Sequence, residues 1–363
     1  MKIAQVCPRY DPDIGGVETH VREISERLVK NGHEVEVITT DPTGKLRKNE
    51  LINGVKVTRF RSLAPGDAYY IAPQTYRYLK GKQFEIIHAH SYHALPALFA
   101  ALANPGSKFI FTPHYHRSGH TFFRDLLHKP YRLLGKIIFS RADKVICVSE
   151  YEKGLLNEDF AVSDKIVKIP NGIDLAEFRN LQRKHKGTSE KTLLYVGRLE
   201  EYKGVQYIIR ALPGLPEFRL QIVGKGPYED ELRKLAGQAG VANRIDWLKD
   251  ISRPELLQYY ACADIFMMLS KHEAYGITVA EALAAGTPCI VAEGSALDEF
   301  VDGEMCIGIS TVSSTEIISS AIKEMWIPQK DHESNKYPIA GWDQITERTV
   351  EIYNDCLESQ YGN

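Results

Sequence analysis

Short β-rich runs alternate with helical segments along the chain, and this alternation constrains the fold more than any other feature. Several of the runs are continuously apolar, which is typical of parallel strands that are covered on both faces. The first series of expected strands comprises Lys2–Val6, Glu34–Thr39, Val55–Phe60, Ile86–His90, Phe109–Thr112 and Val145–Ser149. The second series comprises Leu193–Gly197, Leu220–Gly224, Ile245–Leu248, Ile265–Leu269 and Cys289–Ala292. The pattern predicts an α/β protein with two Rossmann-like, doubly wound domains.

A turn signal separates the two series. Pro170, Asn171 and Gly172 follow one another, and the polar stretch from Asn180 to Lys191 precedes the next expected strand. A length of 363 residues suits two domains. We therefore expect an N-terminal domain over residues 1–170 and a C-terminal domain over residues 171–341.

Composition excludes several classes of protein. The longest apolar run, Ala94 to Ala103, is too short to span a membrane, and the apolar stretch at the N-terminus ends at Pro8, too early for a signal peptide. The 6 cysteines never form a Cys-x-x-Cys pair, which argues against a zinc ribbon and a disulfide scaffold. We expect a cytoplasmic protein with buried thiols.

The net charge of −2 hides an asymmetry between the two halves. Residues 1–171 carry a net charge of +7, and the remaining residues carry −9. This difference suggests an anionic partner for the first half, although two solvated surfaces could also differ in this way. Seven of the residues from Arg117 to Lys144 are basic and two are acidic, with apolar residues between them. Such a segment fits either an interfacial helix on an anionic membrane or an ordinary amphipathic helix.

Polar and glycine residues follow many of the expected strands, at the sheet edge where open parallel sheets bind ligands. They are Gly15, Gly16, His90, His114, Gly197, Arg198, Lys203, Gly224 and Glu273. Gly15 and Gly16 either form a tight turn or let a phosphate approach a helix N-terminus. Arg198 and Lys203 suit a diphosphate, which a planar fork and a point charge can hold together, but they could also be ordinary surface charges.

The segment from Glu273 to Pro288 is the most informative. Glu273 is expected on a loop, Gly276 at the start of a helix and Glu281 within that helix. Free N–H groups near the helix start attract phosphate. The two carboxylates can accept hydrogen bonds from sugar hydroxyls, so the segment fits a nucleotide sugar.

With these motifs, the sequence resembles the retaining glycosyltransferases of family 4, which have the GT-B fold. The matching segments are Gly15 to Glu18, Pro170 to Asp174, Tyr195 to Gly204, Ile222 to Pro227 and the Glu-x7-Glu motif from Glu273 to Glu281. They occur in the family's order and cover nearly the whole chain. The resemblance implies transfer of a sugar from a nucleotide-diphosphate sugar to an acceptor hydroxyl, with retention of anomeric configuration.

The resemblance also implies roles for individual residues. Catalytic roles fall to Arg198, Lys203, Glu273 and His114, with His90 on the acceptor or sugar side. Donor-binding roles fall to Gly15, Gly16, Gly197, Gly224, Tyr275, Gly276, Ile277, Thr278 and Glu281. The final helix, about residues 342–363, would complete the N-terminal domain. Lys249 and the segment Gly294 to Leu297 depart from the family's pattern, which weakens inference about the base and the sugar.

We expect neither a cofactor nor a metal, because Arg198 and Lys203 can neutralise a diphosphate. Asp11 and Asp13 form an Asp-x-Asp that we interpret as a loop feature. The alternating pairs His88/His90 and His114/His116 could share a face and hold a metal, but we expect them to diverge.

The expected partners are a nucleotide-sugar donor, a glycan or lipid-linked acceptor and an anionic membrane surface that contacts residues 117–144, with no nucleic acid. A sugar-nucleotide epimerase of related fold and a non-catalytic sugar-nucleotide-binding subunit remain as alternatives. A nicotinamide dehydrogenase is disfavoured because no Gly-x-Gly-x-x-Gly follows the first expected strand.

Overall fold

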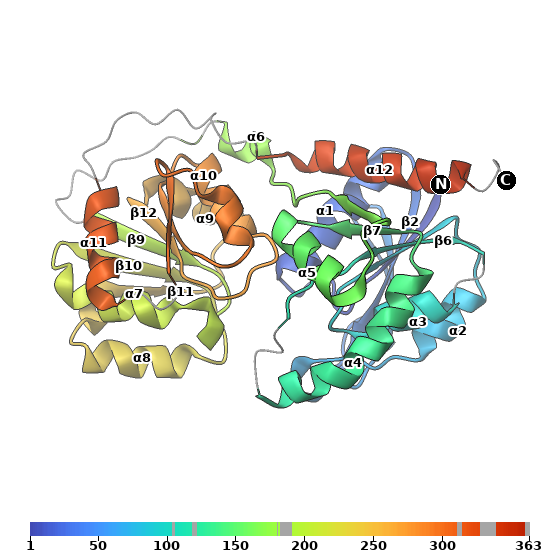
Figure 1. Cartoon of the computed structure of the whole chain (residues 1–363), viewed down its shortest axis with the longest axis horizontal. Helices are drawn as coiled ribbons and strands as arrows, with labels where there is room; N and C mark the ends of the chain where they lie inside the picture. The colour runs from blue at the N-terminus through green and yellow to red at the C-terminus, as the bar shows by residue number, and fades with distance from the viewer. Residues whose placement is uncertain are drawn as a thin grey trace. The chain divides into compact units, whose positions relative to one another are not determined.

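The chain forms two compact units, one built on a mostly parallel sheet and the other on a parallel sheet (Figure 1). The computed structural model describes residues 1–103, 106–117, 122–179, 181, 191–310, 314–326 and 339–359, with the backbone alone for residues 67 and 122–130. The first unit consists of Met1–Gly172 and Ala340–Asn363, and the second consists of Ile173–Ile339. Two parallel-sheet α/β domains confirm the predicted fold class.

The sheet of the first unit has eight strands in the order β3-β4-β2-β1-β5-β6-β7-β8. The strands are β1 (Lys2–Val6), β2 (Glu34–Asp41), β3 (Asn49–Ile52), β4 (Val55–Arg61), β5 (Ile86–His90), β6 (Lys108–Thr112), β7 (Lys144–Cys147) and β8 (Ile166–Lys168). All neighbours pair in parallel except β3 and β4, which form an antiparallel edge. Connections run outward in opposite directions from β1 and β5, so the gap between these strands is the topological switch point.

Helices cover both faces of this sheet. They are α1 (Gly16–Lys30), α2 (Gln74–Lys80), α3 (Leu95–Ala103), α4 (Phe122–Arg141), α5 (Glu150–Phe160) and α12 (Trp342–Glu358), with a single turn at Pro65–Asp67. Helices α1 and α12 pack together on one face, and α2, α3 and α4 lie side by side on the other (Figure 1). Gly172 fits closely against Trp342, the first residue of α12. The last helix of the chain is therefore part of the first unit.

The sheet of the second unit has six strands in the order β11-β10-β9-β12-β13-β14, all parallel. The strands are β9 (Lys191–Val196), β10 (Phe218–Val223), β11 (Ile245–Leu248), β12 (Ile265–Met268), β13 (Cys289–Ala292) and β14 (Cys306–Ile309). This order is that of a dinucleotide-binding fold, and its switch point lies between β9 and β12.

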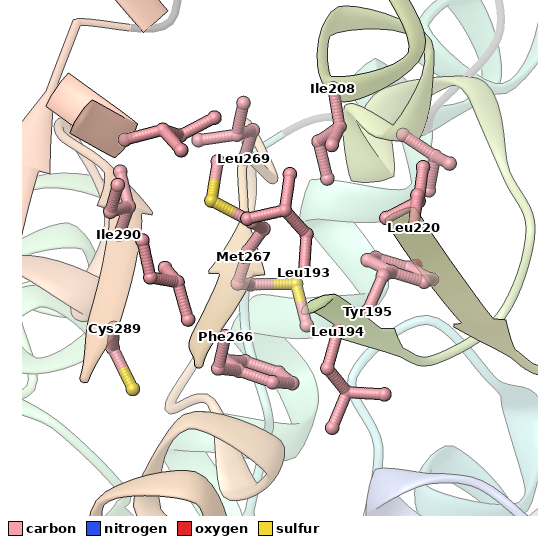
Figure 2. Close-up of a cluster of buried hydrophobic side chains, with 14 of the residues drawn as sticks. Leu193, Leu194, Tyr195, Ile208, Leu220, Phe266, Met267, Leu269, Cys289 and Ile290 are labelled. Carbon is pink, nitrogen blue, oxygen red and sulfur yellow. The ribbon is translucent and has the colours of Figure 1, made fainter. Parts of the chain in front are cut away.

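Helices cover both faces of the second sheet as well. They are α6 (Leu175–Phe178), α7 (Val205–Ala211), α8 (Glu229–Gln238), α9 (Arg253–Cys262), α10 (Ile277–Ala284) and α11 (Thr315–Met325), with short 3-10 turns at Glu201–Lys203, Leu212–Gly214, Ala242–Arg244 and Ala296–Phe300. Figure 2 shows why the strands read as apolar runs: consecutive residues such as Leu193, Leu194 and Tyr195 on β9 are all buried. Phe266 and Met267 on β12 are buried in the same way, so both faces of the sheet are covered at these strands.

Every expected strand is present, with ends that differ by at most two residues. The sequence did not predict β3, β8 and β14, which have three or four residues each. The residues of β3 alternate between exposed and half-buried, because this strand lies at the sheet edge. Such strands form because a neighbour offers hydrogen bonds, so their side chains carry no strong apolar signal.

Two structural findings bear on the classes of protein that the composition argues against. All six cysteines are free thiols, and five of them are buried. Within the ranges that the structure describes, no helix is both long and apolar enough to cross a bilayer.

Candidate active site

In the second unit, an ion pair joins two loops at the switch point. The loop after β9 carries Lys203, and the loop after β12 carries Glu273. Lys203 Nζ lies 2.5 Å from Glu273 Oε1, although the two residues are 70 positions apart. Burial lowers the pKa of Lys203, but the charge and hydrogen bond of Glu273, together with the neighbouring Tyr202 and Tyr195, more than offset burial and hold that pKa above its ordinary value. The pair therefore places a permanent cation beside a carboxylate where parallel sheets bind ligands.

Arg198 adds a second cation to the loop after β9. Its guanidinium lies 3.0 Å from Glu200, and its side chain is 44% exposed. The Tyr195 hydroxyl, at the end of the buried β9, donates a 2.8 Å hydrogen bond to the Arg198 carbonyl. This bond fixes the backbone of the loop and leaves the guanidinium accessible to a ligand.

Glycines let the loops of this edge approach one another. Gly204 has φ +79, and a Cβ there would overlap the carbonyl of Leu269 at the end of β12. Gly224 has φ +147, and its Cβ would overlap the carbonyl of Gly197. Both positions combine a left-handed backbone with a neighbouring main chain, so only glycine fits without strain.

Helix α10 begins at this edge. Its N-cap, Gly276, has φ +107, and as a glycine it has no side chain that could cap the first amides of the helix. The side chains of Tyr275 and Ile277 pack into an apolar cluster, so these residues present their backbone rather than their side chains. The N-terminus of α10, which also includes Thr278, therefore offers amide donors and a partial positive charge that suit a phosphate.

Glu281 lies in the second turn of α10, and two side chains of α9 hold it. The Tyr260 hydroxyl donates to Glu281 Oε2 at 2.8 Å, and Arg253 Nη1 lies 2.6 Å from Glu281 Oε1. Arg253 also contacts Glu177 at 2.6 Å. Burial raises the pKa of Glu281 above its ordinary value, and the charge of Arg253 opposes this shift.

The sequence did not reveal that Arg253 and Tyr260 contact Glu281. The capping box of Ser252 and Glu255 could have located the start of α9. It could not have shown which side chains of α9 face α10, because that depends on how the two helices pack.

In the first unit, three histidines gather at the switch point between β1 and β5. His90 is the last residue of β5, His114 follows β6, and His20 is on α1. The ring centroid of His20 lies 5.3 Å from the ring centroid of His90 and 5.0 Å from that of His114. Burial lowers the pKa of His20 to about 4 and those of His90 and His114 well below their ordinary values. The structure brings together the two predicted histidines and adds His20, which the sequence analysis missed although it shares the apolar face of α1.

A buried carboxylate accepts a backbone hydrogen bond from the loop that carries His114. Glu152, near the start of α5, accepts hydrogen bonds from the backbone N–H of Tyr115 and of Val148. His114 itself has φ +48, which side-chain-bearing residues rarely adopt. Burial raises the pKa of Glu152 to about 7, against the lowering by these N–H bonds. Glu152 therefore positions the backbone that presents His114.

The first loop of the chain leads into α1. Gly15 is the N-cap of α1 and has no side chain that could cap the first amides of the helix. Gly16 is the first helical residue. A Cβ at Gly16 would meet nothing within 4 Å in the described residues, so this position is open. The N-terminus of α1 is thus a second place where backbone amides are presented at a strand end.

The other candidate metal residues do not assemble. The ring nitrogens of His88 lie 2.7 Å from the hydroxyls of Tyr353 and Thr112, and its ring centroid lies 4.1 Å from that of His90. His116 stacks on His93. Asp11 and Asp13 lie on the loop after β1. In the described part of the chain, neither belongs to a group of three or more possible metal ligands.

Part of the basic segment 117–144 is described, and its charges are partly paired. Residues 118–121 and the side chains of 122–130 lie outside the described residues. Arg117 contacts Glu158 and Asp159, and Arg132 contacts Asp159. Among the described side chains of this segment, Arg117 and Arg132 thus form ion pairs with acidic residues of α5.

Comparisons with known proteins identify the family. Residues 14–177 match the family model described as Glycosyltransferase Family 4, and residues 177–334 match the model described as Glycosyl transferases group 1. An uncharacterised glycosyltransferase of Methanocaldococcus jannaschii is 30% identical over 99% of both chains. The chain belongs to glycosyltransferase family 4.

A further relative and a solved structure agree with this assignment. The alpha-monoglucosyldiacylglycerol synthase of Streptococcus pneumoniae is 28% identical, over 84% of this chain and 74% of that protein. The sucrose-phosphate synthase of Thermosynechococcus elongatus superposes with a TM-score of 0.80 at 20% identity, over 99% of this chain and 100% of that one. The chain is therefore a glycosyltransferase with the predicted GT-B fold.

Proposed function

We propose that this glycosyltransferase moves a hexose from a nucleotide-diphosphate sugar to an acceptor hydroxyl, with retention of anomeric configuration. The observation that carries the proposal is the Lys203–Glu273 ion pair at the switch point of the second unit. It combines a cation for a phosphate with a carboxylate for sugar hydroxyls, next to the N-terminus of α10. Three features that suit a nucleotide sugar therefore converge on one sheet edge.

The proposed chemistry needs no metal at the diphosphate. The bond between the anomeric carbon and the phosphate oxygen breaks as the bond to the acceptor oxygen forms. The acceptor's proton passes to the departing phosphate oxygen. Arg198, Lys203 and the amides at the start of α10 stabilise the charge that develops on the diphosphate. His114 and Glu273 contact the transferred sugar, His90 assists on the sugar or acceptor side, and Glu281 accepts from the ribose.

A lipid-linked acceptor is part of the proposal. The pneumococcal relative is named for a glucosylated diacylglycerol, which is a lipid product. On α4, Leu133 is 66% exposed and Ile137 is 38% exposed, four residues apart on one face, with the exposed Lys136 beside them. Apolar and basic side chains on one helix face suit the surface of an anionic membrane. We place the reaction at the cytoplasmic surface of such a membrane.

The decisive experiment joins donor binding to turnover. Thermal unfolding in a panel of uridine, guanosine and adenosine diphosphate sugars should show a raised midpoint for one base, because a ligand at 100 times its Kd adds about 2.7 kcal/mol. With that donor, sugar should appear on an extracted lipid or glycan acceptor. The Glu273→Gln variant should remain folded and lose transfer.

Two outcomes would contradict the proposal. Conversion of the donor to another sugar nucleotide without acceptor would identify an epimerase. Donor binding without transfer to any acceptor, unchanged by Glu273→Gln, would identify a non-catalytic binding subunit.

A further inference from the structure

We propose that His20, His90 and His114 form a binding site for a divalent transition-metal ion, with Zn²⁺ as the best fit. One ring nitrogen from each histidine lies within 4.8 Å of the corresponding nitrogens of the other two. The three residues come from α1, β5 and the loop after β6; His20 and His90 are buried, and so is the Nε2 atom of His114. Imidazole nitrogen is a preferred ligand of zinc.

The unused nitrogens are the main evidence for a ligand. His20 Nε2, His90 Nδ1 and His114 Nε2 are buried and have no hydrogen-bond partner among the described residues. Buried polar atoms are normally paired, so three orphans in one cluster call for an explanation. A shared cation satisfies all three at once, whereas one hydroxyl group cannot.

The outer contacts fix the ring nitrogens of two histidines in the form that binds a metal. His20 Nδ1 lies 2.6 Å from Asn171 Oδ1, and His90 Nε2 lies 2.7 Å from Gln5 Oε1. A carboxamide oxygen only accepts, so each of these nitrogens carries the proton. The opposite nitrogen of each ring then carries an unprotonated lone pair that can bind a metal, as outer-shell partners arrange in zinc sites.

The outer contacts extend further into the unit. Gln5 Nε2 donates to the Tyr353 hydroxyl of α12 at 3.1 Å, which orients the amide that holds His90. Asn171 belongs to the Pro170–Gly172 turn, which lies in the first unit, and its side chain contacts His20.

The spacing fits zinc after a small adjustment. Tetrahedral coordination at 2.0–2.1 Å places ligand nitrogens about 3.4 Å apart, so each ring would move inward by less than about 1 Å. Three neutral imidazoles leave the charge of the ion uncompensated. The fourth position would therefore hold water, hydroxide or an anionic group.

Zinc at this site would also affect transfer, and only this consequence rests on the proposed function. A bound ion would occupy the His114 nitrogen that we assign to the sugar. We therefore expect zinc to inhibit transfer and a chelator to relieve that inhibition.

Binding is tested without substrates, so it can fail or succeed independently of the proposed function. Chelator-stripped full-length protein is titrated with zinc chloride against a chromophoric competitor. We expect one equivalent bound with a Kd at or below about 1 μM, and a raised midpoint of thermal unfolding. His20→Gln should weaken binding at least about 100-fold, and Asn171→Ala should weaken it about 10–100-fold by releasing the His20 ring.

A control and a spectrum protect the test against misfolding. His116→Asn removes a histidine of the neighbouring His93/His116 stack and should leave zinc affinity unchanged. Cobalt(II) bound to the unmodified protein should give the strong visible bands of a tetrahedral nitrogen site. A Kd above about 1 mM, the spectrum of aqueous cobalt, or equal loss of binding in His116→Asn would overturn the proposal.

Discussion

Arg198 and Glu281 are both proposed to touch the donor, but their truncation should affect different kinetic constants. The ribose changes little as the glycosidic bond breaks, so Glu281→Ala should chiefly raise the donor KM. Arg198 acts on the diphosphate as its charge grows, so Arg198→Ala should lower kcat by about 10²–10³-fold, as loss of one oxyanion donor does. Donor-saturation kinetics with circular dichroism as a folding check separate the two effects.

Lys203 provides the internal comparison for this prediction. Lys203→Ala should resemble Arg198→Ala, and the double variant should be less than additive because both cations serve one anion. The assignment of roles would be wrong if Arg198→Ala kept full kcat while Glu281→Ala abolished it at saturating donor.

The buried histidines should make stability depend on pH. Burial lowers the pKa of His20 from 6.5 to about 4, so between these values the unfolded chain binds a proton that the folded chain does not. The contribution of His20 to stability is therefore fully present above pH 6.5 and is lost as the pH is lowered toward 4. His20 alone contributes about 2–3 kcal/mol to this loss between pH 7.5 and 4.5.

Urea unfolding at several pH values, in the presence of chelator, measures this dependence. His20→Gln should flatten the profile by about that amount, whereas His116→Gln should leave it like the wild type. A His20→Gln profile as steep as that of the unmodified protein would show that His20 is not the group responsible.

At the scale of elements, the closeness of loops at the switch point makes certain glycines irreplaceable. Gly224 has φ +147, and Gly224→Ala would push a methyl group into the carbonyl of Gly197. The substitution should therefore destabilise the second unit by about 2 kcal/mol or more and weaken donor binding. Gly237, on the exposed side of α8, has nothing within 4 Å among the described residues. Gly237→Ala should therefore stabilise by up to about 1 kcal/mol. Denaturant melts of the two variants test the contrast, and equal effects of either sign would contradict it.

Helix α4 should determine membrane attachment. Co-sedimentation with liposomes should increase with anionic lipid and decrease with salt, since each surface cation contributes about 1 kcal/mol. Leu133→Glu should reduce binding several-fold, because Leu133 is exposed on the apolar stripe of α4. The matched control is Leu51→Glu on the edge strand β3, where leucine is similarly exposed, at 73% against 66% for Leu133. Equal partitioning onto neutral and anionic vesicles would argue against docking.

At the scale of the whole molecule, the two units should differ in their dependence on metal. Transfer should persist in excess chelator, because Arg198 and Lys203 neutralise the diphosphate in the second unit. A loss of activity that manganese or magnesium restores would refute this prediction. Added zinc should instead slow the reaction through the histidines of the first unit.

The sequence by itself determined which segments form the two sheets and which motifs follow the strands. Strands that are buried on both faces are often apolar at nearly every residue, so β12 and β13 are visible as runs. The same logic located Lys203 and Glu273 after their strands, because parallel strands share one carboxyl edge. Helix α12 was also predictable, since its apolar residues repeat with the helical period.

Only the tertiary structure decided which of these residues meet. The Lys203–Glu273 pair forms because β12 lies beside β9, and nothing local to either residue encodes that strand order. Arg253 reaches Glu281, and His20 joins His90 and His114, for the same reason: each contact links elements far apart in sequence. Periodicity reports whether a side chain is buried, but the partner it finds there depends on which helix and which strand pack together.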